Sequence, residues 1–493
     1  MKIFRNKGAS AALALSLALG LGGCSDLLEV ELPTDLTGDA LDDPVSATSQ
    51  LNSAIVLFEN AMARFQYIIH GHEDGGEVVL MSPSIGTGEF NYRGAATNDE
   101  FFGGFMQSRQ FAKGLHDKLA TEWTVAQVPQ RARYMAITSI YEGAIYSWMA
   151  STLCEGALDA GPLLSQTQMA QLAEETLTRA ITEVGAAGGD FAMPFNISNS
   201  ALNMAYGLRA QMRWATGNVA GAKADAERIP QGFYAYITRE NTSTRRNFAY
   251  YNGPGAKFAA LQGVVDWWQS SLRQPNPATG EKWPAVIPFT GYTELGILPN
   301  GRATRPDGLP IRLAGTIPQP YRTPEEDAAV RDTRTPHIIG IVGGRATPTY
   351  IASKFNSGEG QYMPLVNWQE MVLIRAEADG GQGAIDRVNQ LRQAASLPIV
   401  TYLTAGDTEG IRRMIIEERR RALMLEGRYY YTKLKNLDLT WFPRLQGSMP
   451  NAGQQYQGGV KLAMPDTEYQ LNPNILDLNK RGSGCDAKSR PVF

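Results

Sequence analysis

The sequence predicts a mainly α-helical protein, in which tetratricopeptide-like helical hairpins form a scaffold with a long loop-rich region as a second face. Apolar residues recur at helical spacing over about 40–230 and 366–431, whereas 231–365 is rich in Pro, Gly, Asn and aromatic residues. Neighbouring helical patterns are separated by short turns that contain glycine. Because one hairpin cannot bury its own apolar face, we expect the hairpins to stack on each other.

Residues 1–23 have the pattern of a signal peptide. Basic residues at positions 2, 5 and 7 precede an apolar run, Ala11–Leu21, which is too short to span a bilayer. The run ends in Leu-Gly-Gly-Cys24, which resembles a bacterial lipobox, so we expect cleavage before Cys24 and a lipid on its thiol. Two lipid attachments, a diacylglyceryl thioether and an amide-linked acyl chain, give stable membrane anchoring. The alternative is an ordinary secretory cleavage beside a chance cysteine.

Residues 24–493 are expected to form a single domain. Helices are predicted over Val45–Tyr67, Phe102–Leu119, Tyr134–Trp148, Met169–Val184, Ala201–Ala215 and Ala220–Ile229. The last two are joined at Gly217-Asn218 and have the size of a tetratricopeptide hairpin.

The loop-rich insert between the first two helices contains His70, His72, Glu73 and Asp74. We interpret this cluster as a solvated loop and predict no metal site, because no third ligand follows at a spacing typical of zinc sites.

Three further helices are predicted within Val366–Tyr431. The first two form a hairpin around the glycines at 380–383, and the third begins after a cap at Thr404 or Asp407 and ends at Gly427. The run 417–421, Glu-Glu-Arg-Arg-Arg, is interpreted as an exposed face in which Glu417 pairs with arginines one turn away. Glu418 and Arg375 instead fall in line with apolar residues, so we hypothesise a partly buried Glu418–Arg375 pair that fixes helix register.

Several segments in this region resemble the C-terminal signature of the SusD/RagB family. They are Leu373–Ala378, Ala384–Arg392 and Glu417–Arg428, followed by Met464–Glu468 and Leu471–Ile475, which resemble the family's closing segment. The resemblance implies an outer-membrane lipoprotein, facing the cell exterior, that binds an oligosaccharide or less often a peptide. It further implies delivery of that nutrient to a SusC-like TonB-dependent transporter, which the helical face would contact, without catalysis and without a cofactor.

The resemblance also directs attention to ligand residues. Family members often bind ligand through the region that here holds Asn91, Tyr92 and Asn98, so these are candidates. In the loop-rich region we select Trp283 and Tyr292 as a sugar-stacking platform, because a flat aromatic ring presents apolar surface to the C–H face of a pyranose. The alternative for each residue is ordinary loop packing.

The remaining observations limit the function classes. With Cys24 lipidated, Cys154 and Cys485 are predicted to pair and to tie the C-terminal tail to the helical body; the alternative is a buried free Cys154 and an exposed Cys485. A net charge of −3 without a basic stripe argues against nucleic acid. No phosphate-binding loop, zinc-protease motif or serine-hydrolase elbow is present in the sequence. Two alternatives remain open: a lipid-anchored glycoside hydrolase, whose carboxylate pair the sequence does not identify, and a helical-repeat assembly scaffold without a small ligand.

Overall fold

The computed structural model describes residues 38–69, 78–79, 96–241, 245–252, 264–265, 334, 337–340, 349–401, 403–436, 461–462 and 464–476. By the density of its internal contacts the chain divides into two units, Met1–Thr48 and Ser49–Phe493. The described part of the first unit holds the short helix α2 (Gly38–Leu41) and the 3-10 turn η1 (Pro44–Ser46). Asp43 caps this turn, because its Oδ1 accepts a hydrogen bond of 2.9 Å from the Val45 amide.

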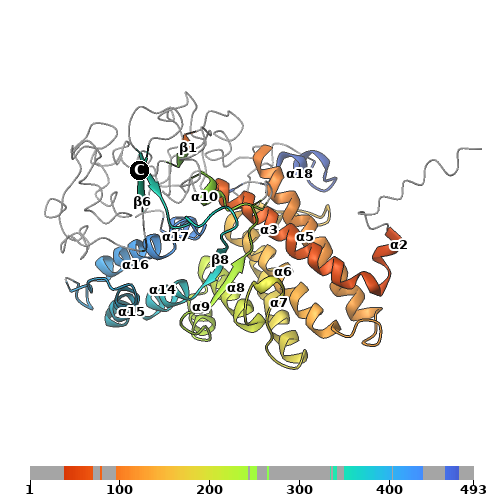
Figure 1. The fold of residues 1–493 in the computed structure, drawn as a ribbon, viewed down its shortest axis with the longest axis horizontal. Coiled ribbons are helices and arrows are strands. Elements are labelled where there is room, and N and C mark those ends of the chain that lie inside the picture. The colour runs from red at the N-terminus through yellow and green to blue at the C-terminus, as the bar shows by residue number, and fades with distance from the viewer. Residues whose placement is uncertain are drawn as a thin grey trace, which may run out of the picture. The chain divides into compact units, whose positions relative to one another are not determined.

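Helices make up most of the described chain, which confirms the predicted fold class. They are α3 (Ala47–Ile69), α5 (Ala96–Thr121), α6 (Arg131–Thr152), α7 (Gln166–Ala186), α8 (Ala201–Ala215), α9 (Val219–Ala226), α14 (Trp368–Asp379), α15 (Gly381–Ala394), α16 (Thr408–Ala422) and α17 (Tyr429–Lys435). From α5 to α9 each helix packs against the next in the chain, and α9 packs against α14 (Figure 1). The last packing joins the two helical stretches across the intervening loop-rich region.

The hairpin α8–α9 shows how the sequence sets these turns. Gly217 adopts φ +94°, a conformation that side chains disfavour, and Asn218 then caps α9 by accepting a hydrogen bond of 3.0 Å from the Gly221 amide. Arg209 on α8 donates two hydrogen bonds, of 2.8 and 2.7 Å, to the carboxylate of Asp225 on α9. The turn chemistry and this buried ion pair together fix the angle between the two helices.

The hairpin α14–α15 and the cap of α16 also follow the sequence prediction. Gly380 ends α14 with φ +62°, and Asp407, one of the two expected caps, accepts a hydrogen bond of 2.8 Å from the Gly410 amide. Helix α16 does not extend to Gly427. It ends at Ala422, and the chain turns through positive φ at Leu425 (+59°) and Gly427 (+76°).

An aromatic cluster around Trp148 forms the core between α3, α5 and α6. The ring centroids of Phe65 and Phe101 each lie 5.7 Å from that of Trp148, and the centroid of Phe105 lies 4.3 Å away. Helix α6 is buried from Ala136 to Thr152 because α5, α7 and α8 pack around it. Apart from Glu142, its buried residues are accordingly apolar, aromatic or small on all sides rather than along one stripe.

The loop-rich region 231–365 leaves and rejoins the scaffold at one place. Strand β4 (Tyr234–Ile237) pairs antiparallel with β8 (Met363–Asn367), so that Tyr234 lies opposite Asn367. The other described pieces of this region are α10 (Phe248–Asn252), β5 (Val264–Val265) and the antiparallel pair β6 (His337–Gly340) with β7 (Thr349–Ala352). Strand β5 pairs with β1 (Val78–Val79) from the earlier insert, and β2 (Glu155–Gly156) pairs with β3 (Leu164–Ser165) between α6 and α7.

The C-terminal segment docks on the end of α6. Leu462 accepts a hydrogen bond of 3.1 Å from the Cys154 amide and donates one of 3.0 Å to the Thr152 carbonyl. After α18 (Asp466–Leu471), the Asn472 side chain donates to the Gly161 carbonyl at 2.9 Å. Cys154 is disulfide-bonded, whereas Cys485, its predicted partner, lies outside the described residues.

Candidate binding pocket and buried charge network

The charged run of α16 lies inside the fold, which corrects its interpretation as an exposed face. Arg419, Arg420 and Arg421 are 1%, 5% and 1% exposed, because α14, α15 and α17 pack around α16. The expected pairs of Glu417 do form: it binds Arg420 one turn away, and its Oε1 accepts a bond of 2.7 Å from Arg421 Nε. Helical spacing therefore predicted the pairs but not their burial.

Glu418 is buried as predicted, but its partner is not Arg375. It forms ion pairs with Arg392 of α15 and with Arg334, whose Nη1 lies 2.7 Å from Glu418 Oε2. Arg375 forms no ion pair with Glu418; its pKa is lowered by burial and by the nearby charge of Arg387. The hypothesis failed because of the rotation of α16 about its axis. Arg419 faces α14, where it approaches Glu370, whereas Glu418 faces α15, where it pairs with Arg392.

Glu370 of α14 is the centre of a buried charge network. Its carboxylate is fully buried and accepts two hydrogen bonds of 2.9 Å from Arg428, at Nε and Nη2, and one of 2.7 Å from Gln211. Arg419 Nη1 lies farther away, at 3.5 Å. Burial acts to raise the pKa of Glu370, but the positive charges of Arg428 and Arg419 outweigh burial and hold the pKa below its ordinary value.

A second junction joins α8, α14, α16 and α17 around Trp214. The indole Nε1 of Trp214 donates to Glu377 at 2.6 Å, and Lys435 Nζ lies 2.7 Å from the other Glu377 oxygen. Arg419 Cζ lies 3.7 Å from the centroid of the Trp214 ring, and Lys435 Nζ lies 4.7 Å from it. Two cations thus contact the π face of a buried ring, an arrangement that gains strength where water is excluded.

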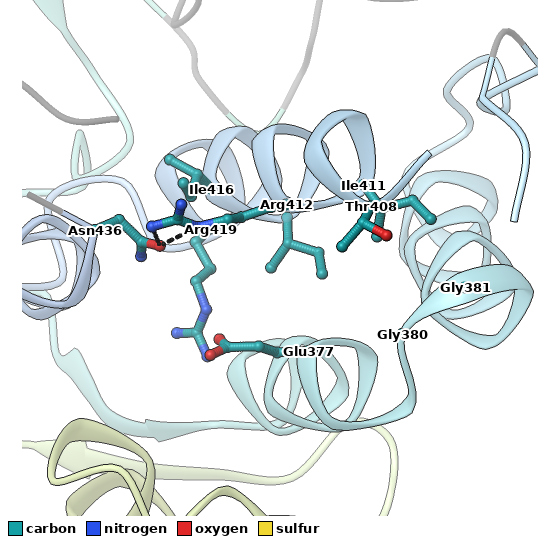
Figure 2. Close-up of a pocket in the computed structure, with 10 residues that line it drawn as sticks. Glu377, Gly380, Gly381, Thr408, Ile411, Arg412, Ile416, Arg419 and Asn436 are labelled. Carbon is teal, nitrogen blue, oxygen red and sulfur yellow. Dashed lines mark hydrogen bonds between the residues drawn. The ribbon is translucent and has the colours of Figure 1, made fainter. Parts of the chain in front are cut away.

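A pocket of about 220 Å³ lies between α16 and the α14–α15 turn (Figure 2). Its walls combine apolar and charged side chains from both segments. The lining residues are Glu377, Gly380, Gly381, Thr408, Ile411, Arg412, Ile415, Ile416, Arg419 and Asn436. Figure 2 shows Arg419 reaching from α16 towards Glu377 on α14, while Arg412 holds Asn436 with bonds of 3.1 and 3.0 Å.

A strip of tyrosines, Tyr234, Tyr236 and Tyr362, lies beside the β4–β8 pair. Alternation along β4 leaves Tyr234 and Tyr236 half-buried on one side, with centroids 5.6 Å apart and planes 14° from parallel. Tyr362, which is 40% exposed, has its centroid 6.3 Å from that of Tyr236. Sequence reasoning missed this tyrosine strip, although the Tyr-Ala-Tyr alternation could have revealed it through the two-residue period of a strand.

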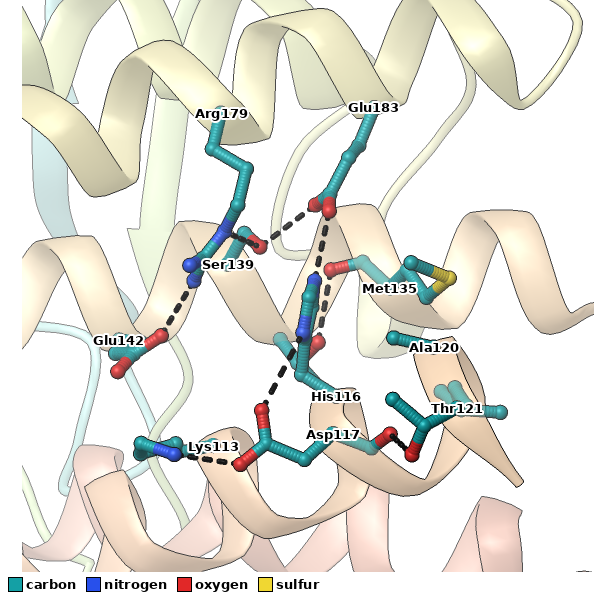
Figure 3. A network of polar contacts seen from close by, with 12 residues as sticks. Lys113, His116, Asp117, Ala120, Thr121, Met135, Ser139, Glu142, Arg179 and Glu183 are labelled. Carbon is teal, nitrogen blue, oxygen red and sulfur yellow. Dashed lines mark hydrogen bonds and ion pairs between the residues drawn. The ribbon is translucent and has the colours of Figure 1, made fainter. Parts of the chain in front are cut away.

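A polar network joins α5, α6 and α7 (Figure 3). His116 Nε2 and Ser139 Oγ bind the two oxygens of Glu183, at 2.7 and 2.6 Å, and Arg179 donates to Ser139 at 3.1 Å and to Glu142 at 2.6 Å. A serine nucleophile needs a hydrogen bond to its histidine base, whereas here serine and histidine share one carboxylate. The geometry identifies this network as an inter-helix clamp.

The predicted lipid and ligand residues lie largely beyond the described part of the chain. Cys24, Asn91, Tyr92, Trp283 and Tyr292 are outside it, as are the insert residues His70, His72, Glu73 and Asp74. Asn98 lies in the first turns of α5, which begins at Ala96 and not at Phe102 as expected. Within the described residues, no cluster of three or more metal-binding side chains occurs and no helix is both long and apolar enough to cross a membrane.

The described fold and pocket define a helical-hairpin protein with a loop-rich excursion and without a recognisable catalytic centre among the described residues. A model of the SusD family matches residues 328–434, the segment that contains α14, α15, α16 and most of α17. No curated protein sequence matches the chain.

Solved structures resemble the chain over most of its length. A SusD superfamily protein from Bacteroides vulgatus is 14% identical, with 88% of this chain and 98% of that chain covered and a TM-score of 0.55. A laminarin-binding SusD-like protein is 15% identical over 86% and 98%, with a TM-score of 0.51. Surface glycan-binding protein A from Bacteroides thetaiotaomicron, solved with laminarihexaose, is 14% identical over 87% and 98%, with a TM-score of 0.52. These structures show that the chain shares the fold of SusD superfamily proteins, and the SusD family model matches its segment 328–434.

Proposed function

We propose that this chain is an outer-membrane lipoprotein, facing the cell exterior, that captures an oligosaccharide and delivers it to a SusC-like TonB-dependent transporter. One observation carries the proposal: the fold matches, over 87% of this chain, a glycan-binding protein solved with laminarihexaose. A second structure of similar coverage was solved with a xylogluco-oligosaccharide. The lipobox at Cys24 supports membrane anchoring.

Capture requires apolar faces for sugar rings and polar groups for their hydroxyls, and no change in covalent bonds. The tyrosine strip supplies stacked aromatic faces beside the point where the loop-rich region joins the scaffold. Trp283 and Tyr292 remain proposed members of the platform. A peptide ligand is the alternative occupant, because aromatic faces also contact apolar side chains.

A binding screen tests the capture of glycans. The lipid-free chain beginning at Ser25 is titrated with neutral oligosaccharides and polysaccharides, alongside Tyr362→Ala, Trp283→Ala and Tyr292→Ala. We expect binding in the parent and a loss of about fivefold or more in at least one variant, because a planar ring stacked on an aromatic side chain, as measured for nucleic-acid bases, contributes about 1–3 kcal/mol. Phe195→Ala is the control, since Phe195 is an exposed aromatic residue (47%) outside the proposed platform.

The same samples distinguish capture from hydrolysis. Bound oligosaccharide should be recovered intact after long incubation; shortened products would replace capture with the glycosidase alternative. No binding to any glycan, together with binding to peptides, would move the ligand class to peptides. No binding to either class would favour the assembly scaffold.

Membrane attachment and the transporter partner need a cellular experiment. We expect Cys24→Ala to release the protein from the outer membrane, and the parent to be degraded by protease added to whole cells. Affinity purification of the anchored parent should recover a TonB-dependent transporter. Retention of Cys24→Ala in the outer-membrane fraction would contradict the lipid anchor.

A further inference from the structure

The pocket between α16 and the α14–α15 turn contains a guanidinium whose hydrogen-bonding capacity is only partly used. Arg419 is 1% exposed, and among the described residues its Nε and Nη2 have no hydrogen-bond partner. Its third nitrogen, Nη1, only approaches Glu370 at 3.5 Å, because Arg428 and Gln211 occupy that carboxylate with shorter bonds. Buried donors without partners are costly, and such groups mark places where a ligand or water completes the structure.

The two unpartnered atoms form one edge of the guanidinium. Nε–H and an Nη2–H point in the same direction, and this edge matches the two oxygens of a carboxylate with two parallel hydrogen bonds. Trp214 covers the guanidinium at 3.7 Å and orients it within the pocket wall. The pair of donors is therefore held in place before any ligand arrives, which reduces the entropy cost of binding.

The other walls do not oppose an anion and add apolar surface. Arg412 also lines the pocket, and its guanidinium donates to the amide oxygen of Asn436. Glu377 also lines the pocket, but Lys435 at 2.7 Å matches its negative charge. Ile411, Ile415 and Ile416 provide apolar surface on the α16 side.

The volume sets the ligand size. About 220 Å³ corresponds to about seven water molecules, and it is smaller than the pockets that hold drug-sized ligands. From these observations we infer that the pocket binds a small carboxylate, of monosaccharide size or less, through the Nε–Nη2 edge of Arg419. The carboxylate belongs either to a free organic acid or to a uronic acid residue of a glycan. The inference uses none of the residues proposed for the glycan platform.

Calorimetric titration of the detergent-solubilised full chain tests this inference. Glucuronate, glucose and glutarate are titrated separately, since glucuronate and glucose differ in the carboxylate and glutarate lacks the sugar ring. We expect glucuronate to bind at least tenfold more tightly than glucose. Equal binding of glutarate identifies a free organic acid as the natural class, whereas a preference for glucuronate identifies a uronic acid.

Two variants assign the binding to this pocket. Thr408 is exposed at the pocket mouth, so Thr408→Trp should fill the entrance and abolish binding without disturbing the buried charges. Glu409→Trp is the matched control, because Glu409 is the next residue and does not line the pocket. Arg419→Lys keeps the charge but removes the two-donor edge, and we expect it to weaken binding at least tenfold.

Failure of this inference can be separated from failure of the proposed function. Neutral oligosaccharides are titrated into the same preparations, and their binding should not respond to Thr408→Trp. If neither acid binds at millimolar concentration, or if Thr408→Trp leaves acid binding unchanged, the pocket holds water only and the inference is wrong.

Discussion

The Arg419 guanidinium lies over the Trp214 indole, with 3.7 Å between Cζ and the ring centroid, although the two residues are far apart in the sequence. Trp214 lies in the last turn of α8 in the first helical stretch, and Arg419 belongs to α16 of the second. Their contact, together with the Trp214–Glu377 hydrogen bond, joins the two helical stretches. This junction is therefore one of the places where the family-like C-terminal segment is held to the rest of the scaffold, together with the packing of α9 against α14.

Two replacements of Trp214 should distinguish the contribution of its indole N–H to stability from the contribution of its ring. We expect Trp214→Phe to lower the free energy of unfolding by about 1–3 kcal/mol, because the partly buried Glu377 carboxylate loses one of its donors. Trp214→Ala should cost about 3–5 kcal/mol through the cavity it leaves. Urea unfolding measures both. Trp123→Phe is the control, since the Trp123 indole donates no hydrogen bond among the described residues; an equal loss there would contradict the role of the N–H.

Glu418→Gln and Arg375→Met should behave differently. Glu418→Gln removes the carboxylate that pairs with buried Arg392 and should cost about 3–5 kcal/mol. Arg375→Met breaks no ion pair with a described residue, so its effect should stay within about 0.5 kcal/mol. Thermal melting of the two variants beside the parent decides the matter. Equal losses of stability in the two variants would instead favour the predicted Glu418–Arg375 pair.

Gly207 should not tolerate a methyl group. A Cβ at Gly207 on α8 would collide with the buried Val366 side chain of β8, so Gly207→Ala should cost about 1–3 kcal/mol. This loss exceeds the gain of about 0.5–1 kcal/mol that alanine ordinarily brings to a helix. Gly114→Ala, in α5 with no atom within 4 Å of the added Cβ, should show that gain alone. Chemical denaturation measures both variants. If Gly207→Ala proves more stable than the parent, as Gly114→Ala should, the close approach of α8 and β8 is refuted.

Acid should destabilise the charge network. The pKa values of Glu370 and Glu377 lie below the ordinary 4.5, since the attraction of neighbouring cations exceeds the effect of burial. Their stabilising contribution is therefore complete above pH 4.5 and is lost as the pH falls through the folded-state pKa values. Glu377→Gln should make the acid loss shallower.

Glu59 should change the stability with pH in the opposite direction. Burial raises its pKa, so the folded state gains stability relative to the unfolded state as this carboxyl takes up its proton. Glu59→Gln should consequently make the acid loss steeper. Unfolding free energies measured from pH 7 to pH 3 test the pair, and parallel profiles for both variants would show that the assigned shifts are wrong.

The disulfide of Cys154 allows the predicted pairing to be tested. If Cys485 is the partner, Cys154→Ser, Cys485→Ser and the double variant should each lose about the same stability, about 2–4 kcal/mol. Alkylation followed by mass measurement, with and without reductant, should detect two cysteines that react only after reduction. A Cys485→Ser variant as stable as the parent would exclude the pairing.

The sequence alone determined the elements whose signals are local. The spacing of apolar residues gave α8 at its observed bounds, Asp407 was one of two expected caps, and glycine at 380 and 217 marked the hairpin turns. Helical spacing also gave the Glu417 pairs with Arg420 and Arg421. These features depend on contacts within about one turn of helix, which a linear pattern records directly.

Only the tertiary structure decided which charges meet and where a pocket opens. Glu418 binds Arg392 and not Arg375 because helix packing, which depends on side chains of all three helices, sets the rotation of α16. The Trp214–Arg419 contact and the pocket beside it combine residues from distant helices, so no local period predicts them. The sequence thus determined the helical elements and the family-like segment, while packing decided the candidate site.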